Sequence, residues 1–307
     1  MQSEKKVQIS IQRSLNQVLL RDIYYSPVVT LHEESPFHLV EENFTVHRIK
    51  HLPVVNTAKK LVGLITMADL LRIVPPRKNL ATENFEYNRT DLDAFNLKEQ
   101  MTTNPISLQP LQSLLDAMEM MVKEGHGCVP VVDEHNKILG IVTQTDIVNI
   151  STKIIEESIE YVSLVEKVPL RMIMSYPPIV LKDDDELSKV EHTLRASRIK
   201  HLPIVNILGR LSGIITLSDL YRTESVRHKD KDGRVKLEKA SLDRHVLKYW
   251  MTKDPFTLTA EDNLLMAMRQ MVKGKYGCVL IINEDKMIRG IITQTDVIKS
   301  IIELIHS

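Results

Sequence analysis

The sequence predicts an α/β (α+β) fold made of four copies of one β-α-β-β-α unit. One repeat relates the two halves of the chain at an offset of 150 residues, because RIKHLPVVN at Arg48–Asn56 returns as RIKHLPIVN at Arg198–Asn206. A second repeat lies inside each half at an offset of 77 residues, where LVGLITMADLL from Leu61 aligns with ILGIVTQTDIV from Ile138. Self-similarity at a fixed spacing indicates a chain built by packing one small unit against its copies.

The repeats divide the chain into four motifs with short segments between them. Residues 1–17 form an N-terminal segment, and residues 153–167 predict a helical linker between the halves. The charged stretches 75–96 and 224–246 predict linkers or surface excursions. A unit of roughly 55 residues buries little surface alone, so we expect the motifs to pair. The four motifs are expected at 18–74, 97–152, 168–223 and 247–304.

Each motif opens with a short apolar run that predicts a strand, as in Pro178–Val180. An amphipathic helix follows, and Ser35, Asp185 and Asp262 stand where its N-cap is expected, with Gln112 in the second motif. The apolar stripe of this helix in the second motif consists of Leu114, Ala117, Met118, Met121 and Val122.

Two β-branched runs then predict a hairpin, as in Leu52–Val55 and Leu61–Ile65, and a second helix starts near the aspartate that follows.

The composition excludes several classes of protein. The chain has 40 Lys and Arg against 40 Asp and Glu, whereas a general binder of nucleic acids or anionic membranes carries a basic excess. Two cysteines, Cys128 and Cys278, cannot build a disulfide framework or a four-cysteine zinc site. The N-terminus lacks the apolar region of a signal peptide, and no run of about 18 apolar residues occurs. We therefore expect a cytoplasmic protein without a membrane partner or a bound metal.

All four motifs carry the sequence Gly-h-h-Thr-x-x-Asp, in which h is apolar, at the expected start of the last helix. One interpretation is a capping box, in which Thr and Asp satisfy the free N–H groups of the helix. The other is a nucleoside site, because a helix start favours a phosphate and a carboxylate accepts from a ribose diol. The Thr and Asp residues are Thr66 and Asp69, Thr143 and Asp146, Thr216 and Asp219, and Thr293 and Asp296.

The order of elements, the openings Met101-Thr102-x-x-Pro105 and Met251-Thr252-x-x-Pro255, and the Gly-h-h-Thr-x-x-Asp endings resemble the CBS-domain family. The resemblance covers almost the whole chain and is similar in layout to the gamma subunits of AMP-activated protein kinase. It implies that motifs pair through their sheets into two Bateman modules, 18–152 and 168–304. It also implies clefts between paired motifs that bind adenosine-containing ligands, namely AMP, ADP, ATP or S-adenosylmethionine.

The resemblance also implies roles for single residues. The four aspartates would bind the ribose, and the four threonines would lie near the ribose or the phosphate. The first strand would line the base with Val29, Ile106, Ile179 and Phe256, for which a plain place in the β core is the alternative.

The residues before Leu-Pro in the hairpin distinguish the motifs. Lys50-His51 and Lys200-His201 stand where the gamma subunits often carry a cation that contacts phosphate. The second and fourth motifs have Gly127-Cys128 and Gly277-Cys278, which offer no cation. We therefore expect unequal occupancy, with only one cleft in each module holding phosphate well. A solvated strand end for the lysines and a partly buried place for the histidines are the alternatives. Arg72 and Arg222, just after two of the aspartates, would contact either a phosphate or solvent.

These features predict a non-catalytic ligand sensor that signals to a protein partner. No glycine-rich phosphate loop, nucleophile elbow or metal-ligand spacing indicates an enzyme. One alternative is a sensor of S-adenosylmethionine or methylthioadenosine, which have no phosphate group. Another is an interaction scaffold or nucleic-acid binder with weakly used sites. A homodimer and packing between modules of one chain both stay open.

Overall fold

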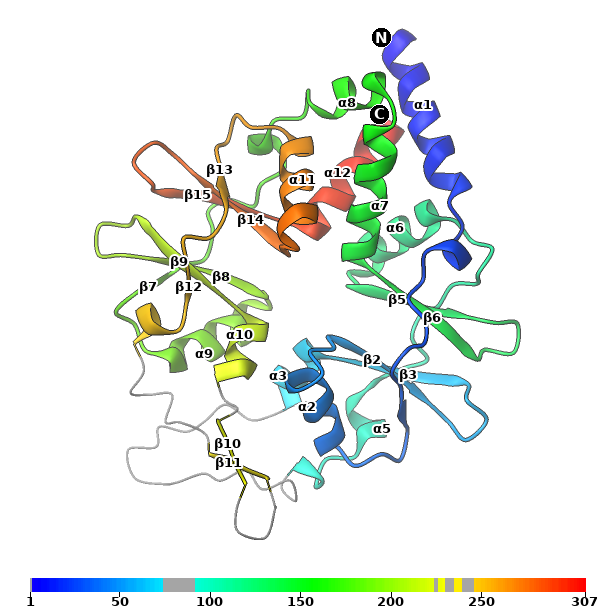
Figure 1. The fold of residues 1–307 in the computed structure, drawn as a ribbon, viewed down its shortest axis with the longest axis vertical. Coiled ribbons are helices and arrows are strands. Elements are labelled where there is room, and N and C mark those ends of the chain that lie inside the picture. Colours follow the sequence, from blue (N-terminus) through cyan, green and yellow to red (C-terminus); the bar gives the residue numbers. More distant parts are fainter. Residues whose placement is uncertain (1, 74–91, 224–225, 230–234, 239–245) are drawn as a thin grey trace. The chain divides into compact units, whose positions relative to one another are not determined.

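The computed structural model describes residues 2–73, 92–223, 226–229, 235–238 and 246–307, and it confirms the predicted mixed α/β fold (Figure 1). The chain forms two compact units, and neither is one half of the sequence. Unit 1 contains the second and fourth motifs, and unit 2 contains the first and third. Unit 1 consists of Met1–Val28, Ile106–Pro178 and Pro255–Ser307, and unit 2 of Val29–Pro105 and Ile179–Asp254.

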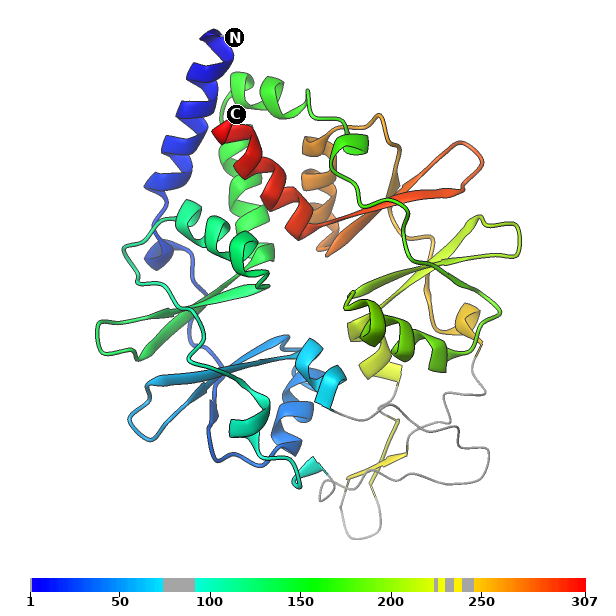
Figure 2. The ribbon, with the colours of Figure 1, turned by 180° about the vertical axis from the view of Figure 1, so that it is seen from behind.

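Unit 1 is rich in long helices. Its N-terminal helix α1 contacts α12, the last helix of the chain, so both ends of the sequence contribute to one unit (Figures 1 and 2). The helices of unit 1 are α1 (Gln2–Gln17), α6 (Leu114–Glu124), α7 (Gln144–Glu156), α8 (Ile159–Val165), α11 (Leu264–Gly274) and α12 (Gln294–His306). Its strands are β5 (Cys128–Val132), β6 (Ile138–Thr143), β13 (Thr257–Leu258), β14 (Cys278–Ile282) and β15 (Ile288–Thr293).

Unit 2 has shorter helices than unit 1, and its two main sheets have more strands. Its helices are α2 (His38–Thr45), α3 (Met67–Ile73), α5 (Leu97–Gln100), α9 (Leu187–Ser197) and α10 (Leu217–Thr223). Its sheets have the orders β1-β2-β3-β4 and β12-β9-β8-β7, beside a separate hairpin of β10 (Val226–Lys229) and β11 (Val235–Glu238). The strands of the two larger sheets are β1 (Leu31–His32), β2 (His51–Val55), β3 (Leu61–Thr66), β4 (Thr102–Thr103), β7 (Leu181–Lys182), β8 (His201–Val205), β9 (Leu211–Thr216) and β12 (Thr252–Lys253).

The segment that leads into each motif pairs with the sheet of another motif. β4 belongs to the opening segment of the second motif but pairs antiparallel with β3 of the first, and β12, in the opening segment of the fourth motif, pairs in the same way with β9 of the third. In unit 1, Tyr25 pairs with Ile141 and Ser175 pairs with Ile291. These pairings explain why the unit boundaries fall inside the predicted motifs. The predicted modules 18–152 and 168–304 depend on how the two units are arranged and stay a prediction.

Each unit has its own hydrophobic core, to which both of its motifs contribute. The predicted apolar stripe of the second motif is confirmed, because Leu114, Ala117, Met118 and Met121 are buried in the core of unit 1 on α6. Phe37 and Phe44 are the largest buried side chains of unit 2. Ile11 and Leu15 anchor α1 to unit 1. The predicted linker 153–167 is helical but not separate, since α7 extends to Glu156 and α8 follows it.

The predicted N-caps are wrong by one or two residues. The helices begin after Phe37, Ser113, Glu186 and Asn263. Ser113 forms a reciprocal capping box with Asp116. Asp185 and Asp262 instead accept hydrogen bonds from the backbone N–H of Lys182 and Thr259, three residues earlier, and so close the turn before the helix. The same residue types favour both positions, because both are local side-chain to backbone hydrogen bonds. Most of the predicted linkers 75–96 and 224–246 lies outside the described residues.

Candidate ligand-binding site

The Gly-h-h-Thr-x-x-Asp sequence forms a capping box in all four motifs. In the first motif, Oδ2 of Asp69 accepts from the backbone N–H of Thr66 at 2.8 Å and from its hydroxyl at 2.6 Å. The same two bonds occur at Thr143 and Asp146, at Thr216 and Asp219, and at Thr293 and Asp296, all between 2.6 and 2.9 Å. Each capping box uses one carboxylate oxygen, Oδ2. The aspartate can accept a hydrogen bond from a ligand only if its second oxygen, Oδ1, is open.

That second oxygen differs between motifs. Asp69 is buried, and its Oδ1 accepts a hydrogen bond from the guanidinium of Arg72. Arg72 is thereby placed against this carboxylate rather than in solvent alone, an ion pair that the sequence analysis missed. In the part of the chain that the structure describes, Oδ1 of Asp146 and of Asp296 has no hydrogen-bond partner. The side chain of Arg222 lies outside the described part. The ribose-binding role of the four aspartates and threonines stays a prediction.

A cluster of basic residues lies in unit 2, formed by Lys50 and His51 of the first motif and Lys200 and His201 of the third. His51 starts β2 and pairs with Thr66, and His201 starts β8 and pairs with Thr216, so each pair stands beside the capping box of its own motif. The backbone C=O of Lys50 and of Lys200 accepts from the first helix residue that follows Thr66 and Thr216, at 3.1 and 2.9 Å. Both lysine side chains are exposed, and both histidines are half-buried.

The electrostatics show that the two motifs contribute to one cluster. Burial, together with the positive charges of Lys200 and Lys50, lowers the pKa of His51 to about 3. Burial together with Lys50 and Lys200 lowers the pKa of His201 to about 4, against the opposing effect of Asp219. Each histidine therefore experiences the lysine of the other motif as well as its own. At neutral pH both histidines are uncharged, and the two lysines carry the positive charge.

From the repeats, the cations were expected to serve separate clefts, one in each half of the chain. The structure instead brings the two lysines and two histidines together in unit 2. Unequal occupancy of the four motifs stays a prediction.

The equivalent place in unit 1 is neutral. Cys128 and Cys278 stand where unit 2 has the histidines, and burial raises the pKa of the Cys278 thiol to about 12. The two motifs are joined by hydrogen bonds from Gln144 Nε2 to Thr295 Oγ1 at 2.9 Å and from Gln294 Nε2 to Thr145 Oγ1 at 3.1 Å. Gly127, Cys128, Gly277 and Cys278 themselves supply no cation at these positions.

Three of the four residues predicted to line the base are exposed, and the fourth, Phe256, packs against the core of unit 1. Val29, Ile106 and Ile179 are 47 %, 41 % and 44 % exposed, which speaks against a plain core position. Val29 and Ile179 lie two residues before the short strands β1 and β7, so the first strand begins later than its apolar run. Phe256 directly precedes β13, is half-buried and stacks beside Tyr276. Their role in binding a base stays a prediction.

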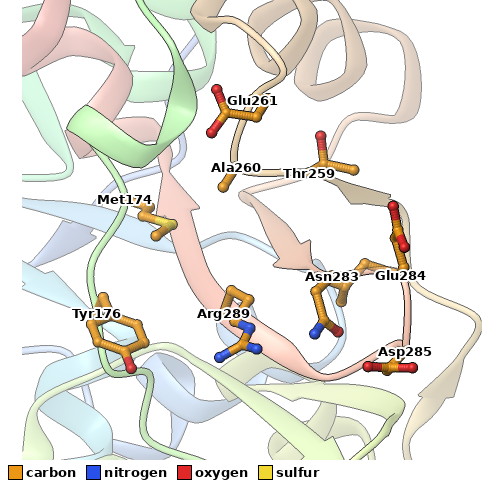
Figure 3. A pocket seen from close by; sticks show the side chains of 10 residues that line it. Met174, Tyr176, Thr259, Ala260, Glu261, Asn283, Glu284, Asp285 and Arg289 are labelled. Atoms are coloured by element: carbon orange, nitrogen blue, oxygen red, sulfur yellow. The ribbon is translucent and has the colours of Figure 1, made fainter.

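A pocket of about 660 Å³ lies in unit 1 on the fourth motif (Figure 3). Arg289 on β15 and Tyr176 on the leading segment line one side, and Thr259 and Glu261 line the other. Glu261 forms an ion pair with Arg171 at 2.7 Å. None of the predicted site residues lines this pocket, and no sequence motif pointed to it, because its lining comes from three separate segments.

A family model for the CBS domain matches residues 20–76, 95–153, 170–225 and 245–303. The chain belongs to the CBS-domain family. Among the described residues of this CBS-domain protein, no three His, Cys, Asp or Glu side chains lie close enough to hold a metal ion. No helix in the described ranges is long and apolar enough to cross a membrane.

Two similar proteins match this chain over nearly its whole length. Uncharacterized protein MJ1225 of Methanocaldococcus jannaschii is 26 % identical over 280 residues, which cover 89 % of this chain and 94 % of that protein. Its crystal structure, described as that of a candidate archaeal homologue of γ-AMPK, has a TM-score of 0.73 at 23 % identity and covers 92 % of this chain and 99 % of that one. An uncharacterized conserved protein of Pyrococcus horikoshii has a TM-score of 0.60 at 18 % identity, covering 92 % and 100 %.

Some enzymes match only in part. Inosine-5'-monophosphate dehydrogenase of Halalkalibacterium halodurans is 30 % identical over 135 residues, which are 44 % of this chain and 25 % of that enzyme. Three quarters of the enzyme therefore lies outside the match. The match gives no evidence of a catalytic domain in this chain.

Proposed function

We propose that this CBS-domain protein is a non-catalytic regulatory protein that binds an adenosine-containing ligand, AMP, ADP or ATP, and signals its presence to a protein partner. The observation that carries the proposal is the basic cluster of unit 2, in which Lys50 and Lys200 from two motifs approach the same two neutral histidines. Like charges held together at a protein surface favour an anion. Strongly perturbed titratable groups also concentrate at functional sites.

The chemistry of the cluster fits a phosphate group. A phosphate monoester carries about −1.5 to −2 charges at pH 7 and has three acceptor oxygens. Two lysine ammonium groups balance that charge, and the neutral imidazoles of His51 and His201 supply one N–H donor each. The capping box of the third motif lies directly beside the cluster, since His201 pairs with Thr216, whose N–H and hydroxyl both donate to Asp219. A ribose that binds such an aspartate and a phosphate that binds the lysines together describe a nucleotide.

Unit 1 favours a second class of ligand. Its equivalent positions carry Gly127-Cys128 and Gly277-Cys278 and offer no positive charge. An adenosine compound without a phosphate, such as S-adenosylmethionine or methylthioadenosine, needs no cation there. We therefore propose this class as the alternative ligand, and a purely structural scaffold as the interpretation that remains if no adenosine compound binds.

Calorimetric titration of the full chain tests the proposal with adenosine, AMP, ADP, ATP and S-adenosylmethionine. In Lys50→Ala with Lys200→Ala, AMP should bind at least about tenfold more weakly, because two charge-assisted hydrogen bonds are lost. Adenosine affinity should stay unchanged. The matched control is Lys60→Ala with Arg210→Ala, which removes two exposed cations at hairpin positions of the same two motifs. Binding by no adenosine compound below millimolar concentration contradicts the proposed function.

We propose no catalytic activity for the chain. Incubation with ATP and analysis of the products by chromatography should show unchanged nucleotide. Turnover that is lost in Asp296→Ala would contradict this part of the proposal, because it would place Asp296 in a catalytic site.

A further inference from the structure

The pocket on the fourth motif has walls that backbone hydrogen bonds hold in place (Figure 3). The N–H of Arg171 donates to the C=O of Ala260 at 2.9 Å, and the N–H of Ser175 donates to the C=O of Ile291 at 2.9 Å. The segment that leads into the third motif is therefore tied to the fourth motif at two places, and Met174 lines the pocket between them. The pocket volume of about 660 Å³ lies within the range of pockets that bind small molecules.

Three hydrogen-bond donors line the lower part of the pocket in Figure 3. The guanidinium group of Arg289 lies between the ring of Tyr176 and the amide of Asn283. Asn283 Oδ1 accepts from the N–H of Met287 at 2.9 Å, so the amide presents its NH₂ group to the pocket as a donor. Within the described part of the chain, the exposed guanidinium of Arg289 has no hydrogen-bond or ion-pair partner. A planar guanidinium binds a carboxylate through two parallel hydrogen bonds.

Two carboxylates make the pocket unsuitable for a phosphate group. Glu284 and Asp285 line it, and neither has an ion-pair partner in the ranges that the structure describes. The third acidic residue, Glu261, is neutralised by its ion pair with Arg171 at 2.7 Å. The positive charge of Arg289 therefore faces two negative charges, which repel a dianion. A ligand with one carboxylate and one ammonium group finds an opposite charge for each.

No other motif carries a cation at the place of Arg289. The second motif, which shares unit 1, also has Asp133 in place of Asn283, so its hairpin offers an acceptor where the fourth motif offers a donor. The second motif is thus a natural reference for this hairpin without a site for a carboxylate. The residues that stand in place of Arg289 in the first, second and third motifs are Val62, Leu139 and Ser212.

We propose that this pocket binds a free α-amino acid with an apolar side chain. Arg289 and the NH₂ group of Asn283 hold its carboxylate. Glu284 and Asp285 hold its ammonium group, and its side chain packs on Met174. None of the capping-box residues lines the pocket, so the amino acid is a second ligand, and its binding does not depend on the proposed adenosine site.

Calorimetric titration of the full chain with L-leucine and L-phenylalanine tests the proposal. Arg289→Leu installs the residue of the second motif and should weaken both amino acids at least about tenfold, because the charge-assisted hydrogen bonds to the carboxylate are lost. Leucinamide, which lacks the carboxylate, should bind the wild type weakly and should not respond to this substitution. The matched control is Lys286→Asn, which also installs the residue of the second motif and removes an exposed cation of the same turn that does not line the pocket. This control should bind L-leucine as the wild type does.

A second variant, Asn283→Asp, separates binding from folding. Asp133 in the second motif accepts the N–H of Lys137 at 2.8 Å, as Asn283 accepts that of Met287, so the turn should keep its thermal stability while L-leucine binds more weakly. Three results would overturn the proposal: equal L-leucine affinity in wild type and Arg289→Leu, tighter binding of leucinamide than of L-leucine, or binding of neither amino acid at millimolar concentration. Adenosine affinity should be the same in all these variants, so failure of the amino-acid site leaves the proposed function standing.

Discussion

In unit 2 a Lys-His pair stands at the start of the first hairpin strand of each motif, whereas in unit 1 a Gly-Cys pair stands there. The backbone at this place is nearly the same, because the residue pair accepts a hydrogen bond from the following helix in all four motifs, at 2.9 to 3.2 Å. The duplication thus preserved the scaffold and changed the charge. Two units with the same backbone and different charge at this place can respond to ligands of different charge.

The two units also hold their motifs together differently at this place. In unit 1, side chains of Gln144 and Gln294 cross between the second and fourth motifs and bond to threonine hydroxyls. In unit 2, the equivalent contact is the weak one from the Ser218 hydroxyl to the sulfur of Met67 at 3.7 Å. Beside that contact, unit 2 gathers two lysines and two half-buried histidines. At this place unit 1 therefore has side-chain hydrogen bonds between its two motifs, and unit 2 has two lysines beside a weaker contact.

The largest difference between the units should appear on acidification. The pKa values of His51 and His201 in the folded chain, about 3 and about 4, lie below the ordinary value of 6.5. The unfolded chain therefore binds more protons, and the stability from the neutral histidines is complete above pH 6.5 and declines as the pH falls toward 4 and then 3. Between pH 7 and pH 4.5 this amounts to roughly 5 kcal/mol for the two residues together.

Urea unfolding at both pH values measures this loss in the wild type and in His51→Cys with His201→Cys, which installs the residues of unit 1. The variant should lose less stability than the wild type over this pH interval, because its carboxylates are the same and only the histidines are gone. Equal losses in the two proteins would show that the histidines are not buried neutral groups.

Substitution of the capping-box aspartates should change the ligand affinity of the motifs by different amounts, and this effect is smaller than that of acidification. Asp146→Asn and Asp296→Asn keep an oxygen for the capping box but replace the open acceptor with an amide N–H₂ group. Each should weaken adenosine binding about tenfold, or about 1.4 kcal/mol, if the carboxylate accepts from a ribose. Asp69→Asn should change the affinity much less, because Arg72 already occupies its second oxygen. Calorimetry decides between them, and a larger effect at Asp69 than at Asp146 would contradict the predicted roles.

The sequence predicted the repeated elements and the capping boxes well, because both depend on local patterns. Met118 and Met121 follow the helical period and are buried, and Thr143 with Asp146 closes a helix start three residues apart. The division into units was not predictable in this way. The division into units depends on opening segments such as Thr102–Thr103, which pair with the sheet of another motif. A two-residue strand is too short for its sequence to show which strand it pairs with.

Prediction of the site was limited for the same reason. Lys50 and Lys200 were singled out as cations, but their convergence depends on which motifs share a unit. Arg72 was expected to face a phosphate or solvent, and its side chain is 63 % exposed, but its ion pair with Asp69 three residues earlier was not foreseen. Phe256 was singled out, but its stacking on Tyr276 depends on packing between segments 20 residues apart, which the sequence does not record.

The smallest effect concerns the hydrogen bonds from Gln144 and Gln294 to threonine hydroxyls in unit 1. Thr145→Val with Thr295→Val removes the hydroxyls that Gln294 and Gln144 contact, and it should lower the free energy of unfolding by less than about 1 kcal/mol, since these exposed donors can bond to water instead. Thermal unfolding of a double-mutant cycle with Gln144→Ala and Thr295→Val isolates one of the two bonds. A coupling energy near zero would mean that the core alone joins the two motifs. The difference between the units would then lie in charge only, and unit 1 would have no structural reason to keep glutamine and threonine at both helix starts.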